Sequence, residues 1–147
     1  MKKTLFFILS FTILTFTYNG AQAQCKNFTK DVCLPTLKPY TYNGQLNSAI
    51  LGEGDVAELL LTFHKGQKYR ISVCNQEIIG DVSFKIFDTK KNLVFEQTQN
   101  SDQSYWDFIS KTTQQLIVQV IVPEEKPKNE VVKTGCVTIL VGFLDEE

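Results

Sequence analysis

The feature that most constrains the fold of this chain is an alternation of apolar and polar side chains with a period of two. In residues 57–64, AELLLTFH, every second side chain is apolar, and residues 68–74, KYRISVC, repeat the pattern after a turn at Lys65 and Gly66. A period of two places successive side chains on opposite faces of a β-strand. Two such runs joined by a glycine turn indicate a β-hairpin.

The same alternation recurs along most of the remaining chain, and no convincing amphipathic helix interrupts it. Two polar stretches, residues 97–104 and 123–135, are predicted to be solvated loops. Further strands are expected at residues 81–88, 92–97, 116–122 and 136–143, around Trp106, and more weakly between Tyr40 and Leu46. This pattern predicts an all-β fold, an antiparallel β-sandwich of about eight strands with jelly-roll-like order.

Residues 1–23 are organised like a cleavable export signal. Two lysines precede an apolar run from Leu5 to Phe16, and an Ala-Gln-Ala sequence at 21–23 provides the small residues that signal peptidase requires. The apolar run is shorter than the roughly 20 residues of a membrane span, and the residues before Cys25 do not follow the lipoprotein pattern. We therefore expect a signal peptide at 1–23 and a single domain at 24–147 that is periplasmic or secreted.

The charge balance restricts the partners of this domain. The whole chain has a formal net charge of −1, and it loses two lysines with the signal peptide. A mildly acidic domain lacks the basic surface that nucleic acid or anionic lipid attracts. The sequence contains no second apolar segment of spanning length, so we expect neither nucleic-acid binding nor stable membrane insertion.

All four cysteines follow the signal peptide, and an even number in an exported protein predicts two disulfides. Their spacing fits no zinc pattern, although free or metal-bound thiols are the alternative. Cys74 and Cys136 fall on the outward phase of their strands, at a strand end and a strand start, as antiparallel neighbours would. We therefore expect Cys74 to pair with Cys136 and Cys25 with Cys33.

The sequence offers little material for catalysis. The single histidine, His64, ends a strand, and there is no GxSxG, GxxxxGK or GxGxxG motif. Glu53 and Asp55 in the GEGD stretch are the candidate calcium ligands, although turn carboxylates commonly accept hydrogen bonds from local backbone amides. We expect no catalytic residue, no metal and no cofactor. The alternative is a glycan hydrolase that uses two carboxylates among Glu53, Asp55, Asp81, Asp88, Asp102 and Asp107.

The SYWDF stretch at 104–108 contains the only tryptophan. If this strand alternates, Trp106 and Phe108 share one face, and two large aromatic side chains on one face are expected in the core. Tyr105 and Asp107 then point outward. They are the candidate ligand-binding residues, because a tyrosine next to an acid can stack on a sugar and hydrogen-bond to it.

Four segments together resemble the bacterial pre-peptidase C-terminal type of domain. They are GDVAELLLTFHKGQKYRISVC, GDVSFKIFDTKKNLVFE, YWDFISKTTQQLIVQVIV and GCVTILVGF, within residues 50–143. Small secreted proteins of the Bacteroidetes kind are similar too. The resemblance implies a non-catalytic β-sandwich, usually appended to secreted hydrolases, with a role in binding, stability or export.

The sequence thus favours a small exported, non-catalytic module that binds a glycan or another exported protein at the cell envelope or outside the cell. An accessory role, through a sheet edge or through the 123–135 loop, is the other alternative to the hydrolase.

Overall fold

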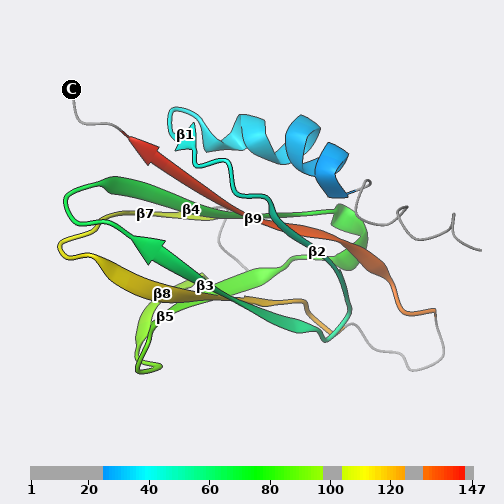
Figure 1. The fold of residues 1–147 in the computed structure, drawn as a ribbon. Helices are drawn as coiled ribbons and strands as arrows, with labels where there is room; N and C mark the ends of the chain where they lie inside the picture. The colour runs from blue at the N-terminus through cyan, green and yellow to red at the C-terminus, as the bar shows by residue number, and fades with distance from the viewer. Residues whose placement is uncertain (1–24, 98–103, 125–130, 145–147) are drawn as a thin grey trace, which may run out of the picture.

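The computed structural model describes residues 25–97, 104–124 and 131–144, and these residues form two antiparallel sheets packed face to face (Figure 1). The five-stranded sheet has the order β1-β9-β4-β7, with β2 also paired to β9, and the four-stranded sheet has the order β3-β8-β5-β6. This confirms the predicted all-β sandwich. The nine strands of the described part are β1 (Thr41–Tyr42), β2 (Asn47–Gly52), β3 (Val56–Phe63), β4 (Lys68–Asn75), β5 (Ser83–Asp88), β6 (Leu93–Gln97), β7 (Tyr105–Ile109), β8 (Gln114–Ile121) and β9 (Thr134–Leu144).

The main core lies between the two sheets and follows the predicted alternation. On β8, for example, Leu116, Val118 and Val120 are buried, while the intervening side chains are more exposed. The inward side chains that fill this core come from five of the strands and from the segments that flank β5 and β8: Leu61, Phe63, Tyr69, Ile71, Val73, Ile79, Val82, Phe84, Ile86, Leu116, Val118, Val120, Val122, Val137, Ile139 and Val141.

Two expectations about the N-terminal part were wrong. Residues 25–28 are α-helical and continue into the π-helical turn η2 (Thr29–Cys33) and the 3₁₀ turn η3 (Leu34–Leu37), where no helix was expected. Of the weak strand predicted between Tyr40 and Leu46, only β1 is a strand, and β2 begins after it at Asn47. A turn at Asn43 and Gly44 separates them, since Gly44 has a φ of 83° and Asn43 Oδ1 accepts a hydrogen bond from the backbone N–H of Gln45.

The helical segment forms a third layer on the outer face of the five-stranded sheet (Figure 1). Cys33, Leu37 and Tyr40 pack there against Leu140 of β9 in a second apolar cluster. β9 is therefore buried on both faces, which explains the long run of buried residues along it. A further 3₁₀ turn, η4 (Glu77–Ile79), follows β4.

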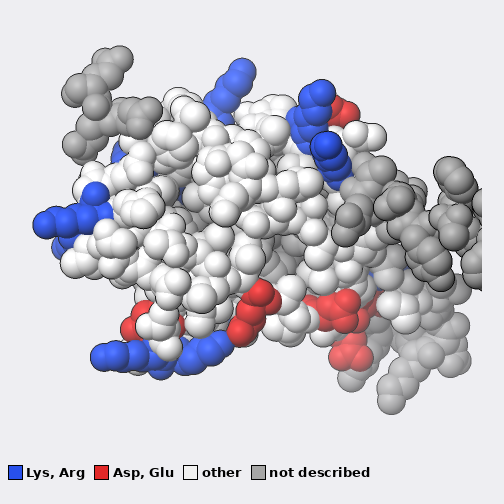
Figure 2. All heavy atoms as spheres, viewed as in Figure 1, with Lys and Arg blue, Asp and Glu red and all other residues white. Residues whose placement is uncertain are grey.

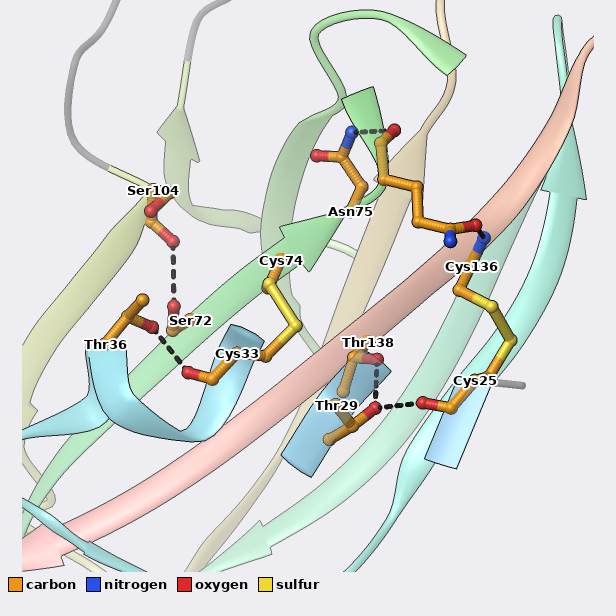
Figure 3. Close-up of a disulfide and its surroundings, with 11 residues drawn as sticks. Cys25, Thr29, Cys33, Thr36, Ser72, Cys74, Asn75, Ser104, Cys136 and Thr138 are labelled. Atoms are coloured by element: carbon orange, nitrogen blue, oxygen red, sulfur yellow. Dashed lines mark hydrogen bonds between the residues drawn. A yellow bond between two sulfur atoms is a disulfide. The ribbon is translucent and has the colours of Figure 1, made fainter. Parts of the chain in front are cut away.

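Two disulfides attach the helical segment to the sheet, as Figure 3 shows. The expected participation of all four cysteines is confirmed, but the expected pairing was wrong. Cys25 is bonded to Cys136 and Cys33 to Cys74, with Cα–Cα distances of 5.4 and 5.8 Å.

The register of the sheet explains the error. Cys74 lies opposite Thr138, so Cys136 is a diagonal neighbour. Diagonal neighbours are about 7–8 Å apart, which exceeds the separation that a disulfide usually spans. Cys25 and Cys33 stand at the two ends of a helical stretch, about 12 Å apart along its axis at 1.5 Å per residue, and cannot meet.

One long side of the sandwich is closed by aromatic side chains. Trp106 of β7 stacks on Phe108 with ring centroids 4.2 Å apart, and on Phe95 of the opposite sheet at 5.3 Å. Trp106 and Phe108 therefore point inward as predicted and pack against the main core, although both remain half-buried.

Several expectations concern residues outside the described part of the chain: the signal peptide at 1–23, Asp102, and the middle of both predicted loops. Among the described helices, none is both long enough and apolar enough to cross a bilayer.

Candidate functional site

The structure brings the two predicted ligand-binding residues, Tyr105 and Asp107, together on the outer face of β7. Asp107 lies opposite Arg70 of β4 in the sheet register. The Arg70 guanidinium donates two hydrogen bonds to the Asp107 carboxylate, Nε to Oδ1 and Nη2 to Oδ2, both at 2.7 Å. It also lies between two aromatic rings, 4.4 Å from the centroid of Tyr40 and 3.9 Å from that of Tyr105.

This arrangement ties three segments of the protein to one another. Arg70 Nη1 donates to the backbone oxygen of Lys38 at 3.2 Å, so the guanidinium links β4, β7 and the segment that follows η3. Both carboxylate oxygens of Asp107 and one face of the Tyr105 ring are used within the protein. The structure therefore gives these side chains a role in holding the segments together, and we call Arg70, Asp107, Tyr40 and Tyr105 the clamp. Binding of a ligand by Tyr105 or Asp107 remains a prediction.

The electrostatics of the clamp follow from its geometry. Burial raises the pKa of Asp107, but hydrogen bonds from Arg70 and Tyr40 and the positive charge of Arg70 together outweigh burial, so the net pKa lies below the usual value. Sequence reasoning missed Arg70 and Tyr40. The strand alternation put Arg70 on the outer face, but only the order of strands places it beside β7.

The candidate calcium ligands, Glu53 and Asp55, occupy the turn between β2 and β3. Asp55 Oδ2 accepts a hydrogen bond from the backbone N–H of Gly52 at 2.7 Å, and Glu53 Oε1 lies 3.9 Å from Lys133 Nζ. The alternative interpretation of these carboxylates as turn-stabilising groups accounts for Asp55. In the described ranges, no three His, Cys, Asp or Glu residues lie close enough together to hold a metal ion.

The long side of the sandwich opposite the aromatic stack is open. There the edge of β2 in one sheet faces the edge of β3 in the other, and two adjoining hollows of about 520 and 210 Å³ lie between them. Both hollows are lined by Asn47 and Leu59, so they form one continuous depression, which we call the β2–β3 groove.

The floor of the groove is apolar and its rim is polar. Leu59, Leu61, Val141 and Phe143 form the floor of the larger hollow, and the smaller hollow is lined mainly by aliphatic side chains. Side-chain amides and a hydroxyl surround the larger hollow, from Asn43, Gln45, Asn47, Thr62 and Gln67, and the buried Tyr69 also lines it.

The groove carries almost no charge. Glu58 is the single acidic residue in the lining of the two hollows, and no lysine or arginine lines either of them. Figure 2 shows the corresponding surface as a broad uncharged area with charged side chains at its borders. His64 also lines the larger hollow, where its backbone N–H donates to Tyr69 Oη at 3.0 Å.

Sequence reasoning did not find this groove. The signal for its rim is the Asn-Gly-Gln-Leu-Asn stretch at 43–47, which is rich in amides, but most of this stretch falls within the strand predicted between Tyr40 and Leu46. Which strands stand at the sheet edges depends on pairings between segments far apart in the chain, and alternation alone does not reveal those pairings.

No family model and no curated protein matches this chain. Among solved structures it is similar to Aeromonas hydrophila PliG, a periplasmic inhibitor of g-type lysozyme, with 12% identity over 71% of this chain and 92% of that one and a TM-score of 0.47. It is also similar to the pre-peptidase C-terminal domain of a collagenase from Bacillus anthracis, with 12% identity, 65% and 88% coverage and a TM-score of 0.45. Salmonella Typhimurium PliG has 15% identity, 66% and 86% coverage and a TM-score of 0.43. The collagenase domain is of the type that the sequence resembles.

Proposed function

We propose that this protein is an exported, non-catalytic binding module that holds an uncharged, extended partner molecule in the β2–β3 groove. The observation that carries the proposal is the combination of an apolar floor, an amide-rich rim and a nearly complete absence of charge. The larger hollow, about 520 Å³, is within the range of roughly 300–1,000 Å³ typical of ligand sites.

The groove chemistry suits a neutral partner. Side-chain amides such as those of Asn43, Gln45 and Asn47 both donate and accept hydrogen bonds. A charged partner would lose its hydration in the groove without finding a counter-charge, which is costly. An apolar surface on the partner would instead gain free energy by covering the floor.

The groove supports binding better than glycan hydrolysis. Glycoside hydrolases generally need two carboxyl groups, about 5–10 Å apart, on either side of the bond that breaks. Glu58 is the single carboxylate among the described lining residues, and its oxygens accept hydrogen bonds from Lys91 Nζ and Gln119 Nε2. That leaves the groove without the pair of carboxylates.

Export forms part of the proposal. Residues 1–23 have the pattern of a signal peptide, and two disulfides are typical of oxidising compartments. Mass spectrometry of the protein recovered from the periplasm or the medium should give a chain that starts at Gln24. A chain that retains residues 1–23 would contradict this.

A pair of matched variants tests the groove. Gln45 is exposed on its rim, and Gln115 is exposed on β8 outside it, so Gln45→Trp fills the groove while Gln115→Trp adds the same side chain elsewhere. We would record NMR spectra of the ¹⁵N-labelled mature protein with neutral oligosaccharides and with peptides selected from a random library.

We expect at least one compound to shift the side-chain amide signals of Asn43, Gln45 and Asn47. Gln45→Trp should abolish this binding, and Gln115→Trp should preserve it. Compounds that shift only the Arg70–Asp107 surface, or a panel in which nothing shifts the groove signals, would contradict the proposal.

A further inference from the structure

We infer that the partner in the β2–β3 groove is an extended polypeptide segment that adds to β3 as a fifth strand of the four-stranded sheet. This inference rests on the proposed function of the groove and identifies the class of molecule that it binds.

The first observation is the character of the β3 edge. β3 pairs with β8 alone, in an unbroken register from Val56 to Phe63. Its sequence, VAELLLTF, contains no lysine and no proline. Proteins usually protect a free sheet edge with a short strand, a lysine, a proline or a bulge, because such an edge pairs readily with another chain.

The other sheet edges of the described fold are shorter than β3. β1 has two residues, β7 has five, and β2, which pairs with β9 alone on the other wall of the groove, has six. β6 has five residues, and its pairing with β5 contains a register shift. β3, with eight residues in an unbroken register, is the longest of these edges, and it borders the groove.

The second observation is the direction of the backbone groups on β3. The Val122 N–H donates to the Asp55 oxygen at 2.9 Å, which makes these residues a hydrogen-bonded pair at the start of the strand. Hydrogen-bonded and non-bonded pairs alternate along antiparallel strands. In this register, Ala57, Leu59 and Leu61 therefore bond to β8.

It follows that the N–H and C=O groups of the intervening residues, Glu58, Leu60 and Thr62, point away from β8 toward the open side. Regularly spaced donors and acceptors of this kind match the backbone of an extended polypeptide. They do not match the hydroxyl pattern of a sugar polymer in any comparable way.

The third observation concerns the side chains that a fifth strand would meet. On the outer face, Leu60 is 53% exposed and stands at the end of an apolar row that continues through Ile117 and Phe87 to Leu93. On the inner face lies the apolar groove floor. An incoming strand would therefore place one uncharged apolar side chain beside Leu60 and alternate side chains on the floor.

The concave shape favours a single strand over a second copy of the whole protein. The hollow lies between β2 and β3 and is lined by residues of both sheets. A lone extended segment can enter such a depression and contact both walls, whereas another folded domain would contact mainly the β3 edge.

Hydrogen exchange tests the edge itself. In the free protein, the amides of Glu58, Leu60 and Thr62 should exchange rapidly, and those of Ala57, Leu59 and Leu61 slowly. Peptides of twelve residues would then be selected from a random display library against the mature, oxidised protein. The best peptide should slow exchange at Glu58, Leu60 and Thr62 by about tenfold or more, as one new hydrogen bond each predicts.

Leu60→Pro removes an N–H that β8 does not use, and proline is tolerated at such positions of an edge strand. It should weaken peptide binding about tenfold, the equivalent of one backbone hydrogen bond. Leu60→Ala, which keeps the N–H, is the control and should weaken binding less. N-methylation of every second peptide amide should abolish binding when the methylated amides are those that face β3, and should have little effect when they are the others. This measurement remains informative even if Leu60→Pro does not fold.

The outcomes separate the inference from the proposed function. A neutral oligosaccharide that shifts the rim amides without protecting the β3 amides would leave the groove as a binding site and overturn strand addition. If the β3 amides are protected from exchange without peptide, and sedimentation then depends on protein concentration, two copies of the protein pair through β3. That result would overturn the inference of a peptide partner. Absence of any groove ligand would overturn both.

Discussion

Two threonine hydroxyl groups lie buried between the disulfides (Figure 3). Thr29 Oγ1 donates to the Cys25 oxygen at 2.8 Å, so Thr138 must donate the hydrogen in the 2.7 Å contact between the two hydroxyls. Thr29→Val therefore leaves the fully buried Thr138 hydroxyl without an acceptor and should cost about 1–3 kcal/mol in urea denaturation. Thr138→Val leaves Thr29 its bond to Cys25 and should cost less.

The double variant provides the control. With both hydroxyls absent, no buried donor remains unpaired, so the loss in unfolding free energy should be smaller than the sum of the two single losses. Additive losses would show that the two side chains do not interact.

The lowered pKa of Asp107 predicts how the free energy of unfolding depends on pH. Burial raises the pKa of Asp107 in the folded protein, but the interactions with Arg70 and Tyr40 lower it by more. The folded pKa is therefore below the unfolded value of about 3.9. A depressed carboxyl pKa contributes stability that is complete above the unfolded pKa and is lost as pH falls through the folded one. At neutral pH the free energy of unfolding of the wild type should therefore exceed that of Asp107→Asn by about 1–2 kcal/mol. This difference should disappear as the pH falls below about 4 and through the folded pKa of Asp107.

Urea titrations of both proteins at several pH values check this expectation. Glu96→Gln is a suitable comparison, since Glu96 pairs with Lys85 at a more exposed position and should change stability little. A constant gap between wild type and Asp107→Asn across the pH range would contradict the clamp.

At the scale of residues, the sequence allowed the direction of side chains to be predicted better than their partners. Alternation correctly put Trp106 inward and Asp107 outward. It could not show that Asp107 meets Arg70, because that contact depends on β7 lying beside β4. The cysteine pairing was wrong for the same reason: parity gives the face of a side chain, but not its distance from another on that face.

Among the elements, the contact between the helical segment and β9 depends on one glycine. A Cβ atom built on Gly142 would lie 2.7 Å from the Tyr40 Cβ and 3.0 Å from Leu37 Cγ. Gly142→Ala should therefore push η3 away from the sheet and cost about 1–3 kcal/mol, as overpacking does. Thermal denaturation would measure the loss.

Gly52→Ala is the matched control, because its Cβ would meet neighbours at an ordinary 3.4 Å. The two variants should differ clearly in melting temperature. Equal melting temperatures would mean that the helical segment packs less closely on β9 than the structure indicates.

Most strands could be predicted from sequence, whereas the helical segment could not. Strands β3, β4, β5 and β8 alternate strongly because one face of each packs in the core, whereas β9 is buried on both faces. The segment at 25–37 combines short helical turns of different types, so its apolar residues Phe28, Leu34 and Leu37 have no regular 3.6-residue spacing. Its stability comes from two disulfides and from packing, which a local pattern does not display.

For the whole molecule, the pairing of the disulfides determines how the helical layer is held. Cys25–Cys136 and Cys33–Cys74 close loops of 111 and 41 residues in sequence. Each is expected to contribute about 4–5 kcal/mol in the chain-entropy model. Peptide mapping of the oxidised protein without reduction should yield these two linked pairs. A Cys25–Cys33 peptide would contradict the structure.

The candidate groove is likewise a property of the whole molecule. Part of its rim comes from residues 43–47 and its walls come from both sheets. The groove can therefore be recognised only when the order of strands is known. The composition of the chain gave a hint of its chemistry, since a low net charge and a scarcity of catalytic residues favoured a binding role. The position of the site could not follow from that hint.

The fluorescence of Trp106 should respond to a substitution on the closed long side of the sandwich, but not to a ligand bound on the open long side. Phe95 and Trp106 join the sheets on the closed side, so Phe95→Ala should expose Trp106, shift its fluorescence to longer wavelength and cost about 2–3 kcal/mol, less than for a fully buried phenylalanine. Leu93→Ala, on the exposed face of the same strand, should leave the spectrum unchanged. A ligand in the β2–β3 groove should also leave it unchanged, because the groove lies on the opposite side of the core. A fluorescence shift on groove binding, abolished by Phe95→Ala, would instead show that the sheets move relative to each other when the open side is filled.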